Sequence, residues 1–173
     1  MIDDIEEFIK YFHGQRRRTQ WVLDRVPPEK AAWRPWPGEP SLVEIVCRIA
    51  AGHLMYATVV AHDYWVVDDY ETFTTDWDHA IHYLDTRTEE ALDLLRVLPN
   101  NVMNEKRRKP APGDLPTSAW RYLMAMLEHE VTSRTQIRDY LMLLNVDKPE
   151  LNAISIDAVR AALNLDSHEQ GGP

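Results

Sequence analysis

One stretch of this sequence, residues 117–146, constrains the fold more than any other. It contains neither glycine nor proline over thirty residues, and it lies between Pro116 and Pro149. Apolar residues recur along it at close to every 3.5 positions, which is typical of a helix that packs in a bundle. These residues are Trp120, Leu123, Leu127, Val131, Ile137, Leu141 and Leu144. The pattern predicts one long helix with this seam turned toward the core.

A second stripe of the same predicted helix is apolar at both ends and polar only in the middle. It consists of Ala119, Tyr122, Met126, His129, Ser133, Gln136, Tyr140 and Leu143. Polar groups on a buried face are costly unless they are hydrogen-bonded or bind a ligand. The polar middle, His129, Ser133 and Gln136, is therefore the first candidate for a functional site.

Helical spacing of apolar residues also predicts helices over residues 3–26, 42–64 and 76–98. Residues 27–40 contain five prolines, together with Trp33 and Trp36. We predict that these two tryptophans pin an irregular connection to the bundle. Ser41, followed three residues later by Glu44, predicts a capping box at the start of the second helix.

Residues 99–116 carry four prolines and a cluster of basic residues, and are expected to form a long connection with a short strand pair. A short fifth helix over 155–165 is expected to pack as a lid. The predicted fold class is therefore all-α: an up-down-up-down four-helix bundle with a long Pro/Trp-rich first connection and a short C-terminal helix. We expect a single domain over 1–165 and a disordered tail over 166–173.

The second predicted helix also has a face that is apolar except in its middle. Arg48 occupies that middle position, and Glu44 stands one turn before it. A glutamate four residues before an arginine can form an intrahelical ion pair. Arg48 and Glu44 therefore join the candidate pocket.

Charge and cysteine content exclude several classes of function. The formal net charge of −9 argues against sequence-independent binding of nucleic acid, which needs a basic surface. The single cysteine, Cys47, cannot form an internal disulfide. The acidic start lacks the layout of a signal peptide, and we expect no apolar run to approach the length needed to cross a bilayer. We expect a cytoplasmic protein with neither a nucleic-acid nor a membrane partner.

Two segments resemble the DinB-like family. WRPWPGEPSLVEIVCRIA, residues 33–50, is similar to a family signature that leads into the second helix. HEVTSRTQIRDYLMLLNVDKP, residues 129–149, is similar to the family's "H-E-x-x-H-R-x-Q" segment. The resemblance implies a four-helix bundle over most of residues 1–150, often a homodimer. It also implies a divalent metal such as zinc or nickel held by three histidines, one on helix two and two on helix four. Some relatives are thiol-dependent transferases or isomerases.

The metal positions implied by the resemblance are only partly matched. They fall on Arg48, His129 and Ser133, so one histidine of three is retained. A guanidinium has no lone pair to offer a metal and would repel a cation. The sequence predicts a degenerate pocket of Arg48, His129, Ser133, Gln136 and Glu44, with no metal, no cofactor and no assigned catalytic residue.

Three functional hypotheses remain open. The first is a metal-free DinB-like protein with a stress-associated role that binds a small or anionic ligand, or that only dimerises while its polar groups satisfy each other and water. The alternative is a metal-dependent thiol transferase or hydrolase that combines His129 with His53, Glu130 or Glu44 around zinc or nickel. The third is metal-free catalysis, with Ser133 as nucleophile and His129 as base.

Overall fold

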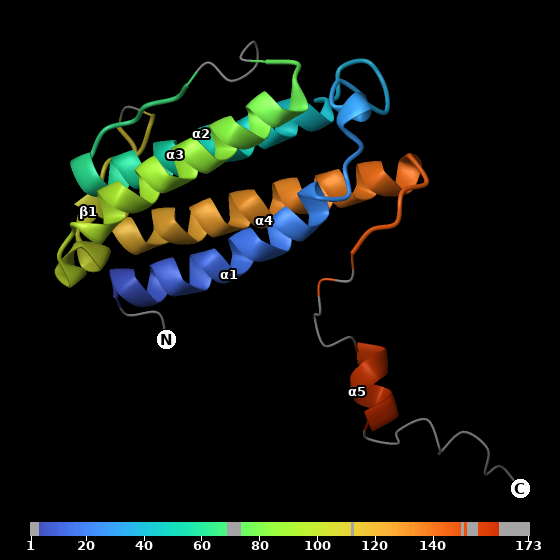
Figure 1. Ribbon diagram of the computed structural model, residues 1–173. Coiled ribbons are helices and arrows are strands. Elements are labelled where there is room, and N and C mark those ends of the chain that lie inside the picture. Colours follow the sequence, from blue (N-terminus) through green and yellow to red (C-terminus); the bar gives the residue numbers. More distant parts are fainter. Residues whose placement is uncertain (1–3, 69–73, 112, 150, 152–155, 163–173) are drawn as a thin grey trace, which may run out of the picture.

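The computed structural model describes residues 4–68, 74–111, 113–149, 151 and 156–162. Four long helices dominate it: α1 (Ile5–Leu23), α2 (Leu42–His62), α3 (Trp77–Arg96) and α4 (Ala119–Leu143). α1 and α4 lie side by side in one layer, and α2 and α3 form the other (Figure 1). The predicted all-α class and the four predicted helices are confirmed.

Three of these helices begin at side-chain caps. Asp4 accepts a hydrogen bond from the backbone N–H of Glu7 at 2.7 Å, and Asp76 accepts one from that of His79 at 2.8 Å. Ser41 and Glu44 form the predicted capping box, in which each side chain accepts a hydrogen bond from the other residue's backbone N–H. These caps satisfy donors that the first turn of a helix leaves without partners.

The order of helix directions differs from the prediction. The N-terminal half of α3 packs in the same core cluster as the N-terminal half of α2, together with the C-terminal ends of α1 and α4. The bundle therefore runs up-down-down-up, with α3 parallel to α2 (Figure 1). The connection of residues 63–76 can span about 45 Å when extended, whereas α2 rises only about 31 Å. It is long enough to return the chain to the other end of the bundle.

A layer of polar residues halfway along the bundle divides the core into two apolar clusters. One cluster gathers around Ile45, Leu84 and Ile137, and the other around Phe8, Leu92 and Leu123. The polar layer between them is contributed by all four helices: Gln15, Thr19, His53, Thr88, Glu130, Ser133 and Arg134, all of them buried.

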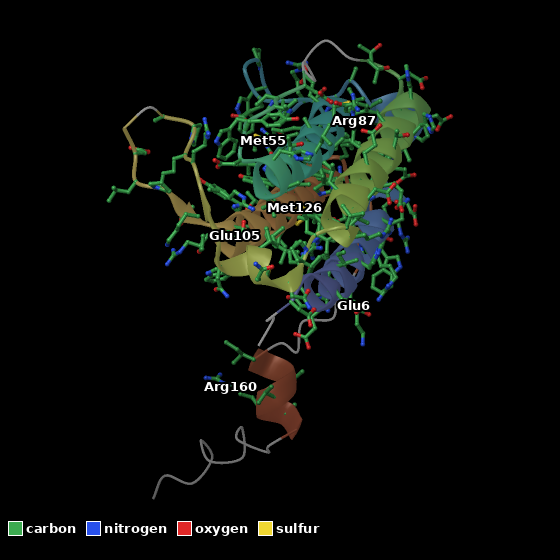
Figure 2. The ribbon with its side chains drawn as sticks, turned by 90° about the vertical axis from the view of Figure 1, so that its left-hand side faces the viewer. Glu6, Met55, Arg87, Glu105, Met126 and Arg160 are labelled. Carbon is green, nitrogen blue, oxygen red and sulfur yellow. The ribbon has the colours of Figure 1, made fainter. Side chains whose placement is uncertain are left out.

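The buried face of α4 is centred differently from the predicted seam. Trp120 and Val131, two of the predicted core residues, are exposed, whereas Met126, Glu130 and Arg134 are buried. Figure 2 shows Met126 inside the bundle. The seam prediction was wrong at these positions because it placed a carboxylate and a guanidinium outside.

The connections are short helices and one small strand pair. The 3-10 helix η1 (Pro28–Lys30) lies in the first connection, where Trp33 packs edge-on against Tyr140 with ring centroids 5.5 Å apart. Trp36 is exposed, so only one of the two tryptophans pins this segment. After η2 (Asn100–Asn104), β1 (Lys106–Arg107) pairs antiparallel with β2 (Thr117–Ser118), as predicted for this region.

The short fifth helix, α5 (Ile156–Ala162), lies apart from the four-helix bundle in both views (Figures 1 and 2). Its described side chains are exposed, so it does not form the expected lid. The predicted disordered tail, residues 166–173, lies outside the described residues.

α2 is long and apolar enough to span a membrane by length and composition, with a mean hydropathy of 1.4 over its most apolar window. The expectation that no segment reaches this length was therefore wrong. Of that window, 72% is buried inside the bundle. α2 is therefore largely a core helix of the bundle.

Candidate functional site

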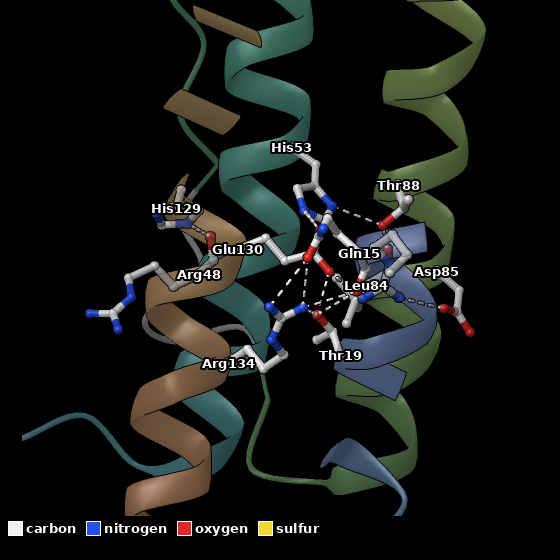
Figure 3. Close-up of polar contacts among 11 residues, drawn as sticks. Gln15, Thr19, Arg48, His53, Leu84, Asp85, Thr88, His129, Glu130 and Arg134 are labelled. Atoms are coloured by element: carbon white, nitrogen blue, oxygen red, sulfur yellow. Dashed lines mark hydrogen bonds and ion pairs between the residues drawn. The ribbon is translucent and has the colours of Figure 1, made fainter. Parts of the chain in front are cut away.

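Glu130 is the centre of the buried polar layer. Its Oε1 accepts a hydrogen bond from the Thr19 hydroxyl at 2.5 Å and lies 3.5 Å from Arg16 Nη1 (Figure 3). Its Oε2 lies 3.2 Å from His53 Nε2. On the other side of the ring, His53 Nδ1 is 3.0 Å from Thr88 Oγ1. Three helices, α1, α2 and α4, thus meet at one carboxylate, and α3 joins through Thr88.

The protonation of this pair follows from its surroundings. Burial raises the pKa of Glu130, but the contacts with His53, Arg16 and Thr19 outweigh burial and hold that pKa below its usual range. Burial lowers the pKa of His53, more than its contact with Glu130 raises it. We therefore assign an ionised Glu130 and a neutral His53 with its hydrogen on Nε2. Thr88 has a single hydroxyl hydrogen, which the Leu84 carbonyl at 2.6 Å and the unprotonated Nδ1 at 3.0 Å must share.

Arg134 extends the layer toward α1. Its Nη1 donates to the Gln15 carbonyl oxygen at 3.1 Å and to Gln15 Oε1 at 3.3 Å, and it lies 3.4 Å from Thr19 Oγ1. Burial lowers the pKa of this guanidinium. The layer ties α4 to α1 by hydrogen bonds, to α2 by the Glu130–His53 contact, and through His53 to Thr88 of α3.

His129 lies on the neighbouring face of α4, against α2. Its Nε2–H donates to the backbone carbonyl of Arg48 at 3.0 Å (Figure 3). Its ring also lies edge-on to Tyr56. Close approach requires Gly52, because an added Cβ there would lie 2.5 Å from the imidazole. Burial, and then the charge of Arg48, lower the pKa of His129, although the Arg48 carbonyl opposes them. The imidazole is therefore neutral near pH 7.

The Arg48 side chain is partly buried and reaches α4. Its Nη2 donates to Gln136 Oε1 at 2.6 Å, and Gln136 Nε2 donates to the Tyr140 hydroxyl at 3.2 Å. Within the described part of the chain, no carboxylate oxygen lies within 4.0 Å of this guanidinium. The cation is bound by a neutral amide.

Glu44 does not share this site. Both of its carboxylate oxygens accept from Arg34 Nη2, at 3.1 and 3.2 Å, and Oε2 also caps α2. Of the five residues predicted for the pocket, the structure brings Arg48, His129 and Gln136 together between α2 and α4. Ser133 is buried on that side of α4, and Glu44 is turned toward the first connection.

The three positions that the resemblance assigns to metal ligands do not fit a divalent cation. Arg48 carries a positive charge and has no lone pair. His129 Nε2 is used by a backbone carbonyl. Across the ranges that the structure describes, no group of three His, Cys, Asp or Glu side chains is close enough to hold a metal ion. His53 and Glu130, the substitute ligands considered for the alternative hypothesis, contact each other in the buried layer instead.

The hypothesis of Ser133 as a nucleophile needs a hydrogen bond to His129. Among the described residues these two side chains form none; the His129 hydrogen bond is made by Nε2 to the Arg48 carbonyl. The arrangement therefore favours binding over nucleophilic catalysis.

Sequence reasoning missed the central role of Glu130, His53 and Arg134. The available signal was position: Glu130 lies four residues after Met126 and seven before Ile137, on a helix face that is otherwise apolar. A charged residue at such a position is buried only with partners on other helices. Thr19, Arg16 and His53 lie more than seventy residues away in sequence, so a local pattern could not supply them.

These features define a class: all-α bundles with up-down-down-up order that place a polar site between their second and fourth helices. The sequence model of the DinB superfamily matches residues 11–137, and the chain belongs to this superfamily. Comparison with curated proteins gives no significant match.

Two solved structures are similar to this chain. A DinB-like protein from Bacillus cereus ATCC 10987 has a TM-score of 0.74 at 14% identity, covering 87% of this chain and 99% of that one. A DinB-like protein from Bacillus subtilis has a TM-score of 0.67 at 16% identity, covering 84% of this chain and 96% of that one. At these identities the similarity establishes a common fold.

Proposed function

We propose that this DinB-like protein binds a small anionic ligand between α2 and α4 without a metal, and that Arg48 supplies the positive charge. The observation that carries the proposal is the surroundings of Arg48. It is partly buried and donates to the neutral Gln136, and no described carboxylate lies within 4.0 Å of it. A partly desolvated cation without a nearby counter-charge favours an anion.

The neighbouring side chains support orientation of a ligand by Arg48. Gln136 accepts a hydrogen bond from one of the five N–H groups of the guanidinium, and its own side-chain amide donates to the Tyr140 hydroxyl. A hollow of about 540 Å³ between α4 and Trp36 has Gln136 and Tyr140 in its wall. Arg48 is not in its wall, so a ligand there contacts Gln136 and Tyr140 and is linked to the guanidinium through Gln136. This role needs no catalytic residue.

We also propose that the protein acts in the cytoplasm as a homodimer, in a stress-associated role and without nucleic acid or membrane. The net charge of −9 supports the absence of nucleic acid. The burial of α2 supports the absence of a membrane partner. The homodimer and the stress-associated role rest on the family resemblance alone.

Calorimetric titration with malonate, and with neutral malonamide as the matched probe, tests this function. Malonate should bind and malonamide should not, and the affinity for malonate should fall as ionic strength rises. Arg48→Gln should weaken malonate binding by at least tenfold. Arg34→Gln is the control, because Arg34 is already paired with Glu44. Equal malonate affinities in the wild type and in Arg48→Gln would refute the proposal.

The alternative remains a metal-dependent thiol transferase or hydrolase that uses His129 with zinc or nickel and substitute ligands. It has less support, because His53 and Glu130 would have to leave each other, and His129 would have to release the Arg48 carbonyl. Leaving a buried donor or acceptor without its partner costs about 1–3 kcal/mol, and more when the group is charged, as Glu130 is.

A further inference from the structure

A groove of about 750 Å³ runs between α1 and α4. At 100° per residue, its α4 residues Trp120, Met124, Leu127 and Val131 lie 160–220° around the helix from His129, by a rough count. The groove is therefore on the opposite side of α4 from Arg48. It shares Val131 and Thr132, but neither Gln136 nor Tyr140, with the hollow of the function proposed above. Its volume is within the range of small-molecule sites, about 300–1,000 Å³.

The walls of the groove are mainly apolar and aromatic. Tyr11 of α1 faces Trp120, Met124, Leu127 and Val131 of α4. The side chains of Tyr11, Trp120 and Val131 line the groove and are exposed to solvent. Arg121 and Glu128 stand at the rim with opposite charges, so the rim has no net preference for one sign of ligand.

The floor of the groove is polar. Gln15 and Arg134 form it, and Arg134 is only 6% exposed. The hydrogen bonds from its terminal nitrogens go to Gln15 and Thr19, whose oxygens are neutral. No carboxylate oxygen among the described residues lies within 4.0 Å of it. The carboxylate of Glu130, the acidic residue in the layer, already contacts Thr19, Arg16 and His53.

We infer that this groove binds an amphipathic carboxylate, with its apolar body against Tyr11, Trp120 and Met124 and its carboxylate directed to Arg134. A neutral apolar ligand would cover a buried cation without adding a counter-charge. A compact anion would leave the aromatic walls exposed to water. A ligand with both parts satisfies both surfaces, and an arginine can bind a carboxylate through two N–H groups.

Decanoate and 1-decanol, kept below their aggregation limits, are the matched probes, since they share the apolar body and differ in charge. The chain has six tryptophans, whose indole N–H signals can be followed by NMR during titration. The signal of Trp120, 41% exposed, should move saturably with decanoate. That of Trp21, 47% exposed and outside the groove, should not move. The affinity for 1-decanol should be at least tenfold lower.

Two matched valine variants test the site without altering the buried layer. Val131→Glu puts a carboxylate in the groove wall and should weaken decanoate binding at least tenfold. Val66→Glu, at a valine that is also 37% exposed but lies outside the groove, should leave it unchanged. Arg48→Gln should also leave it unchanged, which separates this site from the malonate site.

Three results would overturn the inference. The first is equal affinity for decanoate and 1-decanol, and the second is an equal effect of the two valine variants. The third is that the wild-type protein binds no decanoate and sediments as a dimer, whereas the Val131→Glu variant sediments as a monomer. That result would assign the groove to a second copy of the chain.

Discussion

The glycine at position 52 allows His129 to approach α2. An added Cβ would lie 2.5 Å from both Cδ2 and Nε2 of the imidazole. The same imidazole donates to the Arg48 carbonyl, so its position is fixed from two directions. Gly14, on α1, has no such neighbour, since the nearest atom to its added Cβ is Arg17 Nη2 at 3.9 Å.

The two helical glycines should respond oppositely to alanine. Gly52→Ala should lower the free energy of unfolding by about 1–3 kcal/mol, because the ring or the helix must shift. Gly14→Ala should raise it by about 0.5–1 kcal/mol, because alanine favours the helix and nothing opposes its methyl group. Urea unfolding measures both. Stabilisation by Gly52→Ala would show that His129 does not lie against α2.

Acid should destabilise the protein through its buried histidines. Burial lowers the pKa of His53 and His129 from the ordinary 6.5. In the unfolded chain each binds a proton near pH 6.5, whereas in the fold each stays neutral to lower pH. The unfolded state then binds more protons, so stability falls as the pH falls below about 6.5, by at most about 1.4 kcal/mol per pH unit for each histidine.

Urea unfolding of the wild type and of His129→Gln at pH 7.5 and 5.5 tests this dependence. The variant should lose less stability between the two values than the wild type. Equal losses would contradict a neutral, buried His129. Glu130 acts in a separate, lower window: its pKa is held below the usual 4.5, so its contribution is lost only as the pH falls through that lowered value.

At the scale of the element, α4 contributes Glu130, Ser133 and Arg134 to the polar layer, which the other three helices complete. Glu130 at its centre has neighbours from α1 and α2, whereas Glu128, on the same helix, is exposed. The two glutamates share a helix and a chemistry and differ only in surroundings. They form a matched pair for the energetic role of the layer.

Glu130→Ala should destabilise the fold by about 3–5 kcal/mol, because it leaves buried His53 and Thr19 without their acceptor and Arg16 with Asp85 alone. Glu128→Ala should change stability by no more than about 0.5 kcal/mol. Both substitutions gain the same helix propensity, so the difference reports the surroundings. Chemical denaturation measures it, and equal costs would contradict the layer.

Much of each element could be predicted from sequence, because its determinants are local. The capping box of Ser41 and Glu44 and the glycine-free run of α4 are read from neighbouring residues. The burial of Glu130 and Arg134 is not local. It depends on partners on α1 and α2 that meet α4 only after the bundle forms. A charged residue on an apolar face was therefore read as solvent-facing.

At the scale of the whole molecule, the direction of α3 sets which halves of the helices meet. α2 and α3 run parallel, so their N-terminal halves share one core cluster, and the middles of all four helices lie between the two clusters. That level holds the polar layer and, on its α2–α4 side, Arg48 and His129 (Figure 3). Helix periodicity could predict four helices but not this order, since the connection of residues 63–76 is compatible with either direction.

The proposed absence of a bound metal is the central claim at this scale. A divalent ion that bound only the folded state would stabilise it by about 2.7 kcal/mol at a hundredfold excess over Kd. This corresponds to a rise in Tm of roughly 5–10 °C for a chain of this size. We expect added zinc or nickel to shift the Tm by less than about 2 °C. Arg48→His combined with Ser133→His should restore a metal-dependent shift, and adding His129→Ala should remove it again.

The most direct test is elemental analysis of the unmodified chain, purified without chelators from cells grown with zinc and nickel. We predict a content well below one metal ion per chain. The reason is that the three family ligand positions hold Arg48, His129 and Ser133, which together do not form a set of metal ligands. A content near one zinc or nickel ion per chain would contradict the account and give first place to the metal-dependent enzyme.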